Sequence, residues 1–275
     1  MPDMPLVGSA KIPAIGFGTF RMKEGEAHKM TLAAIKAGYR HIDTAKAYEN
    51  EKEVGQAIAD SSVPREDIFL TSKILPEDFG HEQFLTAAKS SLENLETDFL
   101  DLLLLHWPSK EVPLGETMAA ANELVEQGLV RHIGVSNFTI SMFDEALLLL
   151  DTPLAANQIE FHPFIDQSKV LTHLVKNGVA FEAYAPLAQG RVANDPLLQE
   201  IAEKHEATAV QVALAWILSK PNAVVLPKTA TPDRLASNLA AIEVALTQDE
   251  LQRIDELQEQ NLRFVSPETL APEWD

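Results

Sequence analysis

Residues 38 to 51 read GYRHIDTAKAYENE. The preceding residues, 26 to 37, place apolar side chains at helical spacing, and Gly38 then offers the left-handed conformation at which helices commonly end. A short strand follows and ends at Asp43, a carboxylate that a buried strand does not use for packing. Tyr48 comes next, in a polar turn before a second helical pattern. This order predicts a parallel α/β unit with a site at the carboxyl end of its strand.

The same order of helix, glycine and strand occurs twice more along the chain. Helical patterns stop at Gly128 and at Gly178, and each glycine leads into an apolar strand that ends in a polar or aromatic residue. The strands are expected at residues 15–20, 39–43, 69–73, 99–106, 129–136, 155–160, 179–184 and 223–228. The helical patterns cover residues 26–37, 51–60, 81–95, 115–127, 139–149, 168–176, 195–205, 209–219, 232–241 and 247–259.

This alternation predicts the α/β class, as a (β/α)8 TIM barrel preceded by an amino-terminal β-hairpin that turns at residues 8–9. Strands separated by helices pair in parallel through right-handed crossovers, and eight such units in about 250 residues close into a barrel. An open, doubly wound sheet is the structural alternative. The dinucleotide fingerprint of that fold is incomplete, because Arg21 stands where a third glycine should follow Gly16 and Gly18. No linker divides the chain, so residues 1–275 are expected to form a single domain.

The composition narrows the class of function. Asp and Glu number 41 against 22 Lys and Arg, a formal net charge of −19, so nucleic acid and anionic membrane surfaces are excluded as partners. The chain has no cysteine, which excludes disulfides and thiolate chemistry. Residues 1–11 lack the pattern of a leader, and no apolar run is long enough to span a membrane. We expect a soluble, cytoplasmic, monomeric protein whose partner is a small molecule.

Polar side chains end most of the predicted strands. They are Asp43, Lys73, His106, Ser136, Gln158, Tyr184 and Lys228. Each alone has an ordinary structural explanation, such as a cap, a packed aromatic ring or a cation at an edge. A barrel would nevertheless gather them at one rim, because the carboxyl ends of its strands all face the same way. The eight histidines show no metal-binding spacing, so no metal is expected.

A tyrosine, a lysine, an aspartate and a histidine in one pocket suit the protonation of a carbonyl oxygen. A lysine ammonium about 4 Å from a phenol favours the phenolate by roughly 4 kcal/mol at an effective dielectric of 20. We therefore expect Lys73 to lower the pKa of Tyr48 toward neutrality, with Asp43 holding Lys73 in place. A neutral His106 would hydrogen-bond the oxygen that receives the proton. Reduction also needs a hydride donor, which these side chains do not supply.

Segments matching one known family run in order along essentially the whole chain. They are residues 16–20, 38–45, 48, 50–51, 71–73, 105–108, 134–138, 157–160 and 226–229. The chain resembles the aldo-keto reductases. The resemblance implies an NADPH-dependent oxidoreductase that reduces aldehydes and small ketones to alcohols. The implied catalytic tetrad is Asp43, Tyr48, Lys73 and His106, with Tyr48 as the proton donor and NADPH as the source of hydride.

The same resemblance implies how NADPH lies across the rim. The implied cofactor contacts are Gly18, Thr19, Phe20, Asp43, Ser136, Asn137, Gln158, Tyr184, Pro186, Leu187, Gln189, Gly190, Lys228, Thr229, Arg234 and Asn238. Residues 136, 137 and 158 would hold the nicotinamide carboxamide, residue 184 would stack on its ring, and the loop 186–190 would wrap the pyrophosphate. Residues 228, 229 and 234 would grip the 2′-phosphate, with residue 238 near the adenine. Ser237 departs from the glutamate of many NADPH-using members.

For the substrate, the resemblance implies a pocket between Phe20, Tyr48, His106 and Trp107, with Trp274 as a further apolar wall. The chain ends soon after its last helix, so we expect an open pocket and broad specificity. Its length and ending are most similar to the bacterial 2,5-diketo-D-gluconate and methylglyoxal reductases. Two alternatives stay open: a Schiff-base aldolase that uses a strand-end lysine as nucleophile, and a catalytically silent NADP(H)-binding scaffold of the same fold.

Overall fold

A computed structural model of the protein describes residues 4–23 and 25–275. The single domain is expected over residues 1–275, and residues 1–3 and 24 of that range lie outside the described residues. None of the helices in the described ranges is long and apolar enough to cross a membrane.

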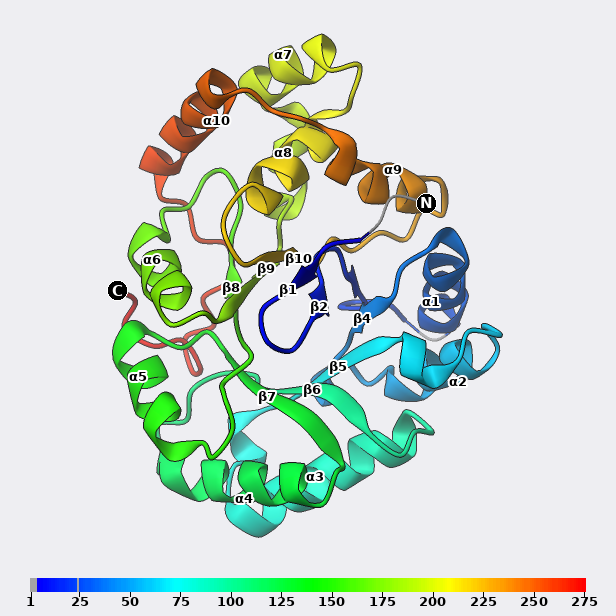
Figure 1. Ribbon diagram of the computed structural model, residues 1–275, viewed down its shortest axis with the longest axis vertical. Helices are drawn as coiled ribbons and strands as arrows, with labels where there is room; N and C mark the ends of the chain where they lie inside the picture. The colour runs from blue at the N-terminus through cyan, green and yellow to red at the C-terminus, as the bar shows by residue number, and fades with distance from the viewer. Residues whose placement is uncertain (1–3, 24) are drawn as a thin grey trace.

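Eight parallel strands form one sheet in sequence order, with the helices around it (Figure 1). The strands are β3 (Phe17–Gly18), β4 (His41–Asp43), β5 (Phe69–Ile74), β6 (Leu100–Leu105), β7 (Val130–Ser136), β8 (Ala156–Glu160), β9 (Ala180–Tyr184) and β10 (Ala223–Val225). The sheet closes because Ile15, just before β3, forms a parallel bridge with Val225 of β10. Closure in sequence order confirms the (β/α)8 barrel and excludes the open sheet.

The helices also fall close to the predicted ranges. They are α1 (Glu26–Ala37), α2 (Glu51–Ala59), α3 (His81–Asn94), α4 (Leu114–Glu126), α5 (Ile140–Leu149), α6 (Ser168–Lys176), α7 (Pro196–Lys204), α8 (Ala209–Leu218), α9 (Asp233–Leu239) and α10 (Gln248–Asp255). The last two are shorter than predicted because 3₁₀ turns over residues 240–243 and 256–260 continue them. The expected strand 15–20 is reduced to β3, since the chain before it bonds to Val225 rather than to β4.

Glycine stops α1 as the sequence predicted. Gly38 has φ 113°, and its N–H donates to the carbonyl oxygens of Ala34 and Ile35 at 3.1 Å. An L side chain rarely adopts such a φ, so glycine satisfies the last helical carbonyls without strain. The chain can then turn back at once into the barrel, which places Asp43 at the end of β4.

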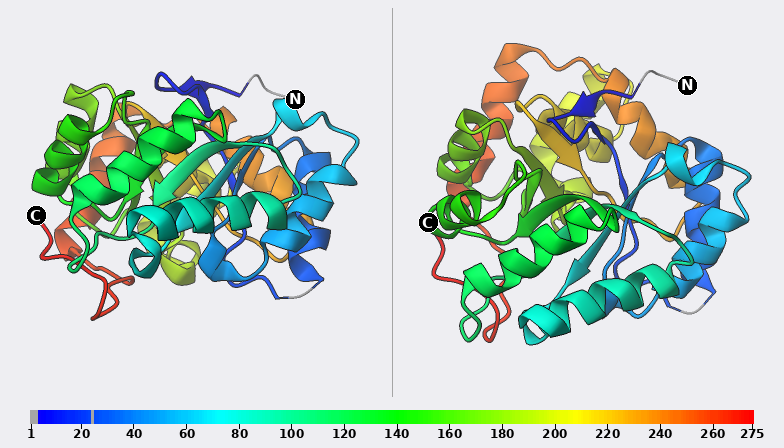
Figure 2. Two further views of the ribbon diagram at one scale, coloured as in Figure 1. Left: turned by 90° about the horizontal axis from the view of Figure 1, so that it is seen from below. Right: turned by 60° about the horizontal axis from the view of Figure 1, so that its bottom comes forward.

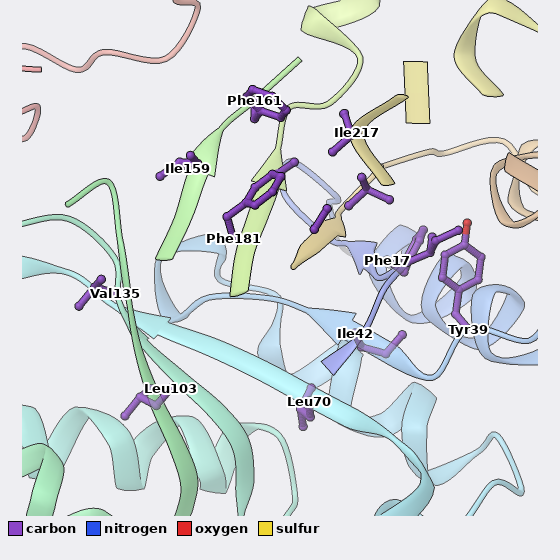
Figure 3. Packing of buried hydrophobic residues seen from close by; sticks show 14 of the residues in the cluster. Phe17, Tyr39, Ile42, Leu70, Leu103, Val135, Ile159, Phe161, Phe181 and Ile217 are labelled. Atoms are coloured by element: carbon purple, nitrogen blue, oxygen red, sulfur yellow. The ribbon is translucent and has the colours of Figure 1, made fainter. Parts of the chain in front are cut away.

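Two apolar layers hold the barrel together. Successive residues of a strand point to opposite faces, and β6 shows this clearly: Leu103 and Leu105 pack outward under the helices, whereas Leu102 and Leu104 fill the barrel. Figure 3 shows the outer layer, in which Phe17 meets Tyr39 edge to face at 5.8 Å. The inner layer fills the amino-terminal part of the barrel and leaves the carboxyl-terminal rim to polar side chains.

A short hairpin closes the amino-terminal end of the barrel. Strands β1 (Leu6–Val7) and β2 (Ile12–Pro13) pair antiparallel, as predicted, and Ile12 packs into the inner apolar layer. In the left view of Figure 2 the hairpin lies at one end of the barrel and the carboxyl-terminal segment at the opposite end. The rim with the strand-end polar residues is therefore the open face, beside the carboxyl-terminal segment.

Candidate active site

The structure brings together the four residues of the predicted tetrad. Asp43 ends β4, Lys73 lies in β5, and His106 follows β6 directly. Tyr48 comes from the 3₁₀ turn over residues 46–48 and reaches back over the rim. Residues from three regions of the sequence, 43–48, 73 and 106, thus meet at one rim of the barrel.

Lys73 is the centre of this group. Its Nζ donates to Asp43 Oδ1 at 2.6 Å, to the carbonyl oxygen of Thr44 at 2.9 Å and to Tyr48 Oη at 3.2 Å. The lysine is fully buried, and Asp43 is 4% exposed. Three acceptors satisfy all three N–H donors of the ammonium group, so the side chain has one defined position.

The same contacts keep Lys73 charged. Burial opposes its charge, but Asp43 and Tyr48 outweigh that effect and raise its pKa. A Schiff-base aldolase needs a neutral lysine amine as nucleophile. A fully buried ammonium with three acceptors cannot serve that chemistry, so the geometry disfavours the aldolase alternative.

The expected pKa shift of Tyr48 is wrong. Burial raises the pKa of Tyr48 above its ordinary value, and the opposing charge of Lys73 does not overcome it. The charge of Lys73 alone would lower the pKa of Tyr48, but the loss of water around the buried phenol has the larger effect. Tyr48 is therefore fully protonated at neutral pH. It remains a suitable acid, because an alkoxide is a stronger base than a phenolate.

His106 faces Tyr48, with ring centroids 5.8 Å apart. Burial and the charge of Lys73 hold the pKa of His106 well below its usual range, so the ring is neutral as expected. Its Nδ1 is buried without a hydrogen-bond partner among the described residues. A neutral ring has one N–H, and leaving that N–H on a buried atom with no acceptor is costly. We therefore assign the proton to Nε2.

Side-chain bonds fix the loop that carries Tyr48. Thr44 Oγ1 donates to Asn50 Oδ1 at 2.9 Å, and Asn50 Nδ2 donates to the carbonyl oxygens of Thr19 and Met22. Thr19 is fully buried, and its hydroxyl donates to the carbonyl oxygen of Asp43 at 3.1 Å. These contacts join the β3 and β4 ends, so the tyrosine is positioned before any ligand arrives.

A second network lies beside the tetrad. Tyr184 Oη donates to Asn137 Oδ1 at 2.8 Å, and Asn137 Nδ2 donates to Ser136 Oγ at 3.0 Å. Ser136 Oγ in turn donates to the carbonyl oxygen of Gln158 at 2.9 Å. The Gln158 amide nitrogen donates to Asp43 Oδ2 at 2.9 Å, which links this network to the tetrad. The predicted nicotinamide contacts are thus contiguous with the predicted tetrad.

The loop after β9 has an unusual backbone. Ala185, Ala188, Gln189 and Gly190 all have positive φ, between 47° and 97°. Such conformations are strained for residues other than glycine and concentrate at ligand sites. Pro186 and Leu187 lie within the same loop, which the family resemblance implies to wrap a pyrophosphate.

The predicted adenosine end lies after β10. Lys228 and Arg234 are exposed, and neither forms a salt bridge within residues 4–23 and 25–275. Thr229 accepts the N–H of Thr231 at 3.0 Å, and Asn238 is buried. Two exposed cations without acidic partners in a protein of net charge −19 suit an anionic ligand.

Aromatic rings lie on the rim near the tetrad. Phe20 is 51% exposed, and the centroid of its ring lies 5.0 Å from that of Tyr48. The ring centroids of Trp107 and Trp274 are 6.3 Å apart. Arg263 stacks on Trp274 at 3.7 Å. An exposed phenylalanine beside the tetrad is a ready contact for an apolar part of a substrate.

Two buried acids near the site were not singled out from the sequence. Glu160 accepts the backbone N–H groups of Phe264 and Val265 at 2.7 and 2.9 Å, which fastens the carboxyl-terminal segment to the rim. Glu182 lies inside the barrel against Gln158. The signal was available, since each is a carboxylate within a predicted strand, where an ionised side chain is expensive.

Comparison with known proteins agrees with this geometry. The model of the aldo/keto reductase family matches residues 14–259. This chain belongs to that family. Its members are oxidoreductases that use a nicotinamide cofactor and act on small carbonyl compounds. Among the described residues of this chain, no cluster of acids and histidines could bind a metal ion.

Several relatives of this aldo/keto reductase match along nearly their whole length. Methylglyoxal reductase DkgB of Escherichia coli O157:H7 is 41% identical, over 96% of this chain and 99% of that protein. Glyoxal reductase of Bacillus subtilis strain 168 is 38% identical, over 96% of each chain. A crystal structure described as that of "a putative 2,5-diketo-D-gluconic acid reductase B" superposes with a TM-score of 0.97 at 47% identity, covering 99% of this chain and 98% of that one.

Proposed function

We propose that this aldo/keto reductase is an NADPH-dependent enzyme that reduces aldehydes and small ketones to alcohols. Methylglyoxal-type carbonyls and 2,5-diketo-D-gluconate are the proposed substrates. The observation that supports the proposal most strongly is the position of Lys73, whose ammonium group lies between Asp43 and Tyr48. The names of the related reductases support the same class of substrate.

The bound cofactor would supply a hydride to the carbonyl carbon of the substrate. Ser136, Asn137 and Gln158 would hold its nicotinamide end, and Tyr184 would stack on the ring. The loop at 186–190 would follow the pyrophosphate. Lys228, Thr229 and Arg234 would bind the 2′-phosphate, and Asn238 would lie near the adenine. Gly18, Thr19, Phe20 and Asp43 would border the cofactor at the ends of β3 and β4, where Gly18 lies against Lys228 and Asp43 bonds to Gln158.

The tetrad would deliver the proton. Nε2 of His106 donates a hydrogen bond to the carbonyl oxygen and holds it toward Tyr48. Tyr48 gives its hydroxyl proton to the alkoxide oxygen as that oxygen gains charge. The phenolate left on Tyr48 is stabilised by the ammonium of Lys73, which Asp43 keeps in position. Phe20 and Trp107 would exclude water from the reacting carbonyl.

Consumption of NADPH with methylglyoxal, 2,5-diketo-D-gluconate and an aromatic aldehyde tests this proposal. We expect turnover with NADPH, a much higher KM for NADH, and the alcohol as the product in each case. Tight NADPH binding without turnover on any carbonyl would contradict the proposal and favour the scaffold alternative. Assays with both cofactors in parallel separate a missing activity from a different cofactor preference.

A further inference from the structure

Glu182 is a fully buried acid that the proposed mechanism does not use. It lies in the middle of β9, where its register neighbours are Gln158 on β8 and Val224 on β10. Val224 belongs to the inner apolar layer. The side chain of Glu182 therefore lies inside the barrel, on the boundary between that apolar layer and the polar rim.

One amide group connects Glu182 to the tetrad. Gln158 Nε2 donates to Glu182 Oε2 and to Asp43 Oδ2, both at 2.9 Å. An amide nitrogen has two hydrogens, so both are used, and the orientation of the Gln158 amide is fixed by the two acids. The other oxygen of Asp43 accepts from Lys73. A continuous chain of hydrogen bonds thus runs from Glu182 through Gln158, Asp43 and Lys73 to Tyr48.

The charges around Glu182 do not balance if it is ionised. The groups that face it are Asp43 and His41 from β4, Lys73 from β5 and Gln158 from β8. Lys73 is the one cation among them, and Asp43 already pairs with it. His41 Nε2 lies 3.9 Å from Glu182 Oε1, but burial lowers the pKa of His41 to about 4, so it is neutral.

The unpaired oxygen of Glu182 also indicates that this side chain is neutral. Oε1 is buried and has no hydrogen-bond partner within the part of the chain that the structure describes. A buried, unpartnered carboxylate oxygen is costly when it is charged. Burial and the charge of Asp43 raise the pKa of Glu182 to about 8, against the smaller effects of Gln158 and Lys73.

We propose that Glu182 is a positioning residue for carbonyl reduction, which works in its neutral form by holding the Gln158 amide against Asp43. In that form Asp43 is the only ionised buried carboxylate beside Lys73 among the described residues. Ionised Glu182 places a second negative charge one amide away from Asp43. That charge opposes the phenolate that forms on Tyr48 and slows proton donation. This inference rests on the proposed reductase function.

The first test compares the pH profiles of kcat for the wild type, Glu182→Gln and Glu51→Gln with saturating NADPH. The wild type should lose kcat on the alkaline side with an apparent pKa near 8. Glu182→Gln imitates the neutral acid, so it should keep kcat at pH 7 within about threefold and lose this alkaline limb. Glu51 is a buried acid that accepts from Ser72 and Asn94, so Glu51→Gln should retain the wild-type limb.

Two results would overturn the proposal. One is a Glu182→Gln enzyme with the wild-type alkaline limb, and the other is a folded Glu182→Gln enzyme that has lost kcat by more than about tenfold at pH 7. The first would assign the limb to another group. The second would show that the carboxyl group itself, rather than its neutral hydrogen-bonding shape, is required.

The second test needs no cofactor and no turnover. The folded protein keeps a proton on Glu182 up to about pH 8, whereas the unfolded chain releases it at about pH 4.3. The folded state therefore binds the extra proton in this window, and the wild type should lose stability as pH rises through it. Thermal unfolding at closely spaced pH values should show a decline that Glu182→Gln lacks. Parallel curves for both proteins would contradict a neutral Glu182.

Infrared spectroscopy of the wild type covers the case in which Glu182→Gln fails to fold. A protonated buried carboxyl group should be visible at pH 7 and disappear with a midpoint near 8. Its absence at pH 7 would overturn the proposal. If the wild type reduced no carbonyl at all, the proposed function would fail, while unfolding and infrared data would still decide the protonation state of Glu182.

Discussion

Replacing Lys73 with methionine removes the charge on which the proposed proton donation depends, while keeping most of the side-chain volume. Lys73 Nζ lies 3.2 Å from Tyr48 Oη. At an effective dielectric of 20, a unit charge at this distance stabilises a phenolate by about 5 kcal/mol. If about half of the phenolate charge has developed in the transition state, about 2.5 kcal/mol is lost, and kcat should fall about 70-fold.

The assay is kcat with methylglyoxal and saturating NADPH, with NADPH affinity measured separately by fluorescence. Lys73→Met leaves Asp43 buried without its cation, so its stability should fall, and the double variant D43N/K73M should recover stability without recovering kcat. Lys46→Met is the matched control, because Lys46 lies two residues before Tyr48 and pairs with Asp78. A folded Lys73→Met enzyme that binds NADPH and keeps kcat within about threefold of the wild type would refute the reasoning.

Three further predictions follow from individual contacts. Lys228→Ala should weaken NADPH binding about tenfold, because a charge-assisted bond to the 2′-phosphate is worth about 1.5 kcal/mol. Binding of NADH, which lacks this phosphate, should not change. Equal losses for both cofactors would be evidence against a 2′-phosphate site. Gly16→Ala should lower the free energy of unfolding, measured in urea, by about 1–3 kcal/mol. An added Cβ would lie 2.7 Å from His41 Nδ1 and 2.5 Å from Leu226 Cδ2. An unchanged unfolding midpoint would contradict this prediction. Glu160→Gln should weaken the two backbone contacts of the carboxyl-terminal segment and speed its proteolysis about tenfold; cleavage at the wild-type rate would show that other contacts hold the segment.

Much of the fold was predictable because it depends on local signals that repeat. Gly38 stops a helix for a backbone reason that needs no tertiary context, and the strands carry apolar runs of the right length. The (β/α)8 barrel then followed from the count of units. The ends of elements were less predictable: the first strand is only Phe17–Gly18, because the residues before it bond to Val225 across the closure of the sheet.

The meeting of the tetrad residues was predictable from the sequence, and their electrostatics were less so. Parallel strands in a barrel end at one rim, so Asp43, Lys73 and His106 had to meet once the fold was known. The predicted shift in the pKa of Tyr48 was wrong in direction. Burial of the phenol decides the direction, and burial depends on packing that the sequence does not show. The sequence marks Glu182 only as a carboxylate within a predicted strand and does not show what it contacts. Its partners, Gln158 and through it Asp43, come from other strands, and only the barrel register brings them together.

The most direct test of the central claim is Tyr48→Phe, which removes the proposed proton donor and keeps the ring. Proton donation by a positioned acid contributes about 10²–10⁴-fold, so kcat for methylglyoxal should fall by at least about 100-fold. NADPH affinity should stay within about twofold, since the Tyr48 hydroxyl bonds to Lys73 in the protein itself. A Tyr48→Phe enzyme that folds, binds NADPH and reduces methylglyoxal at the wild-type kcat would contradict the account.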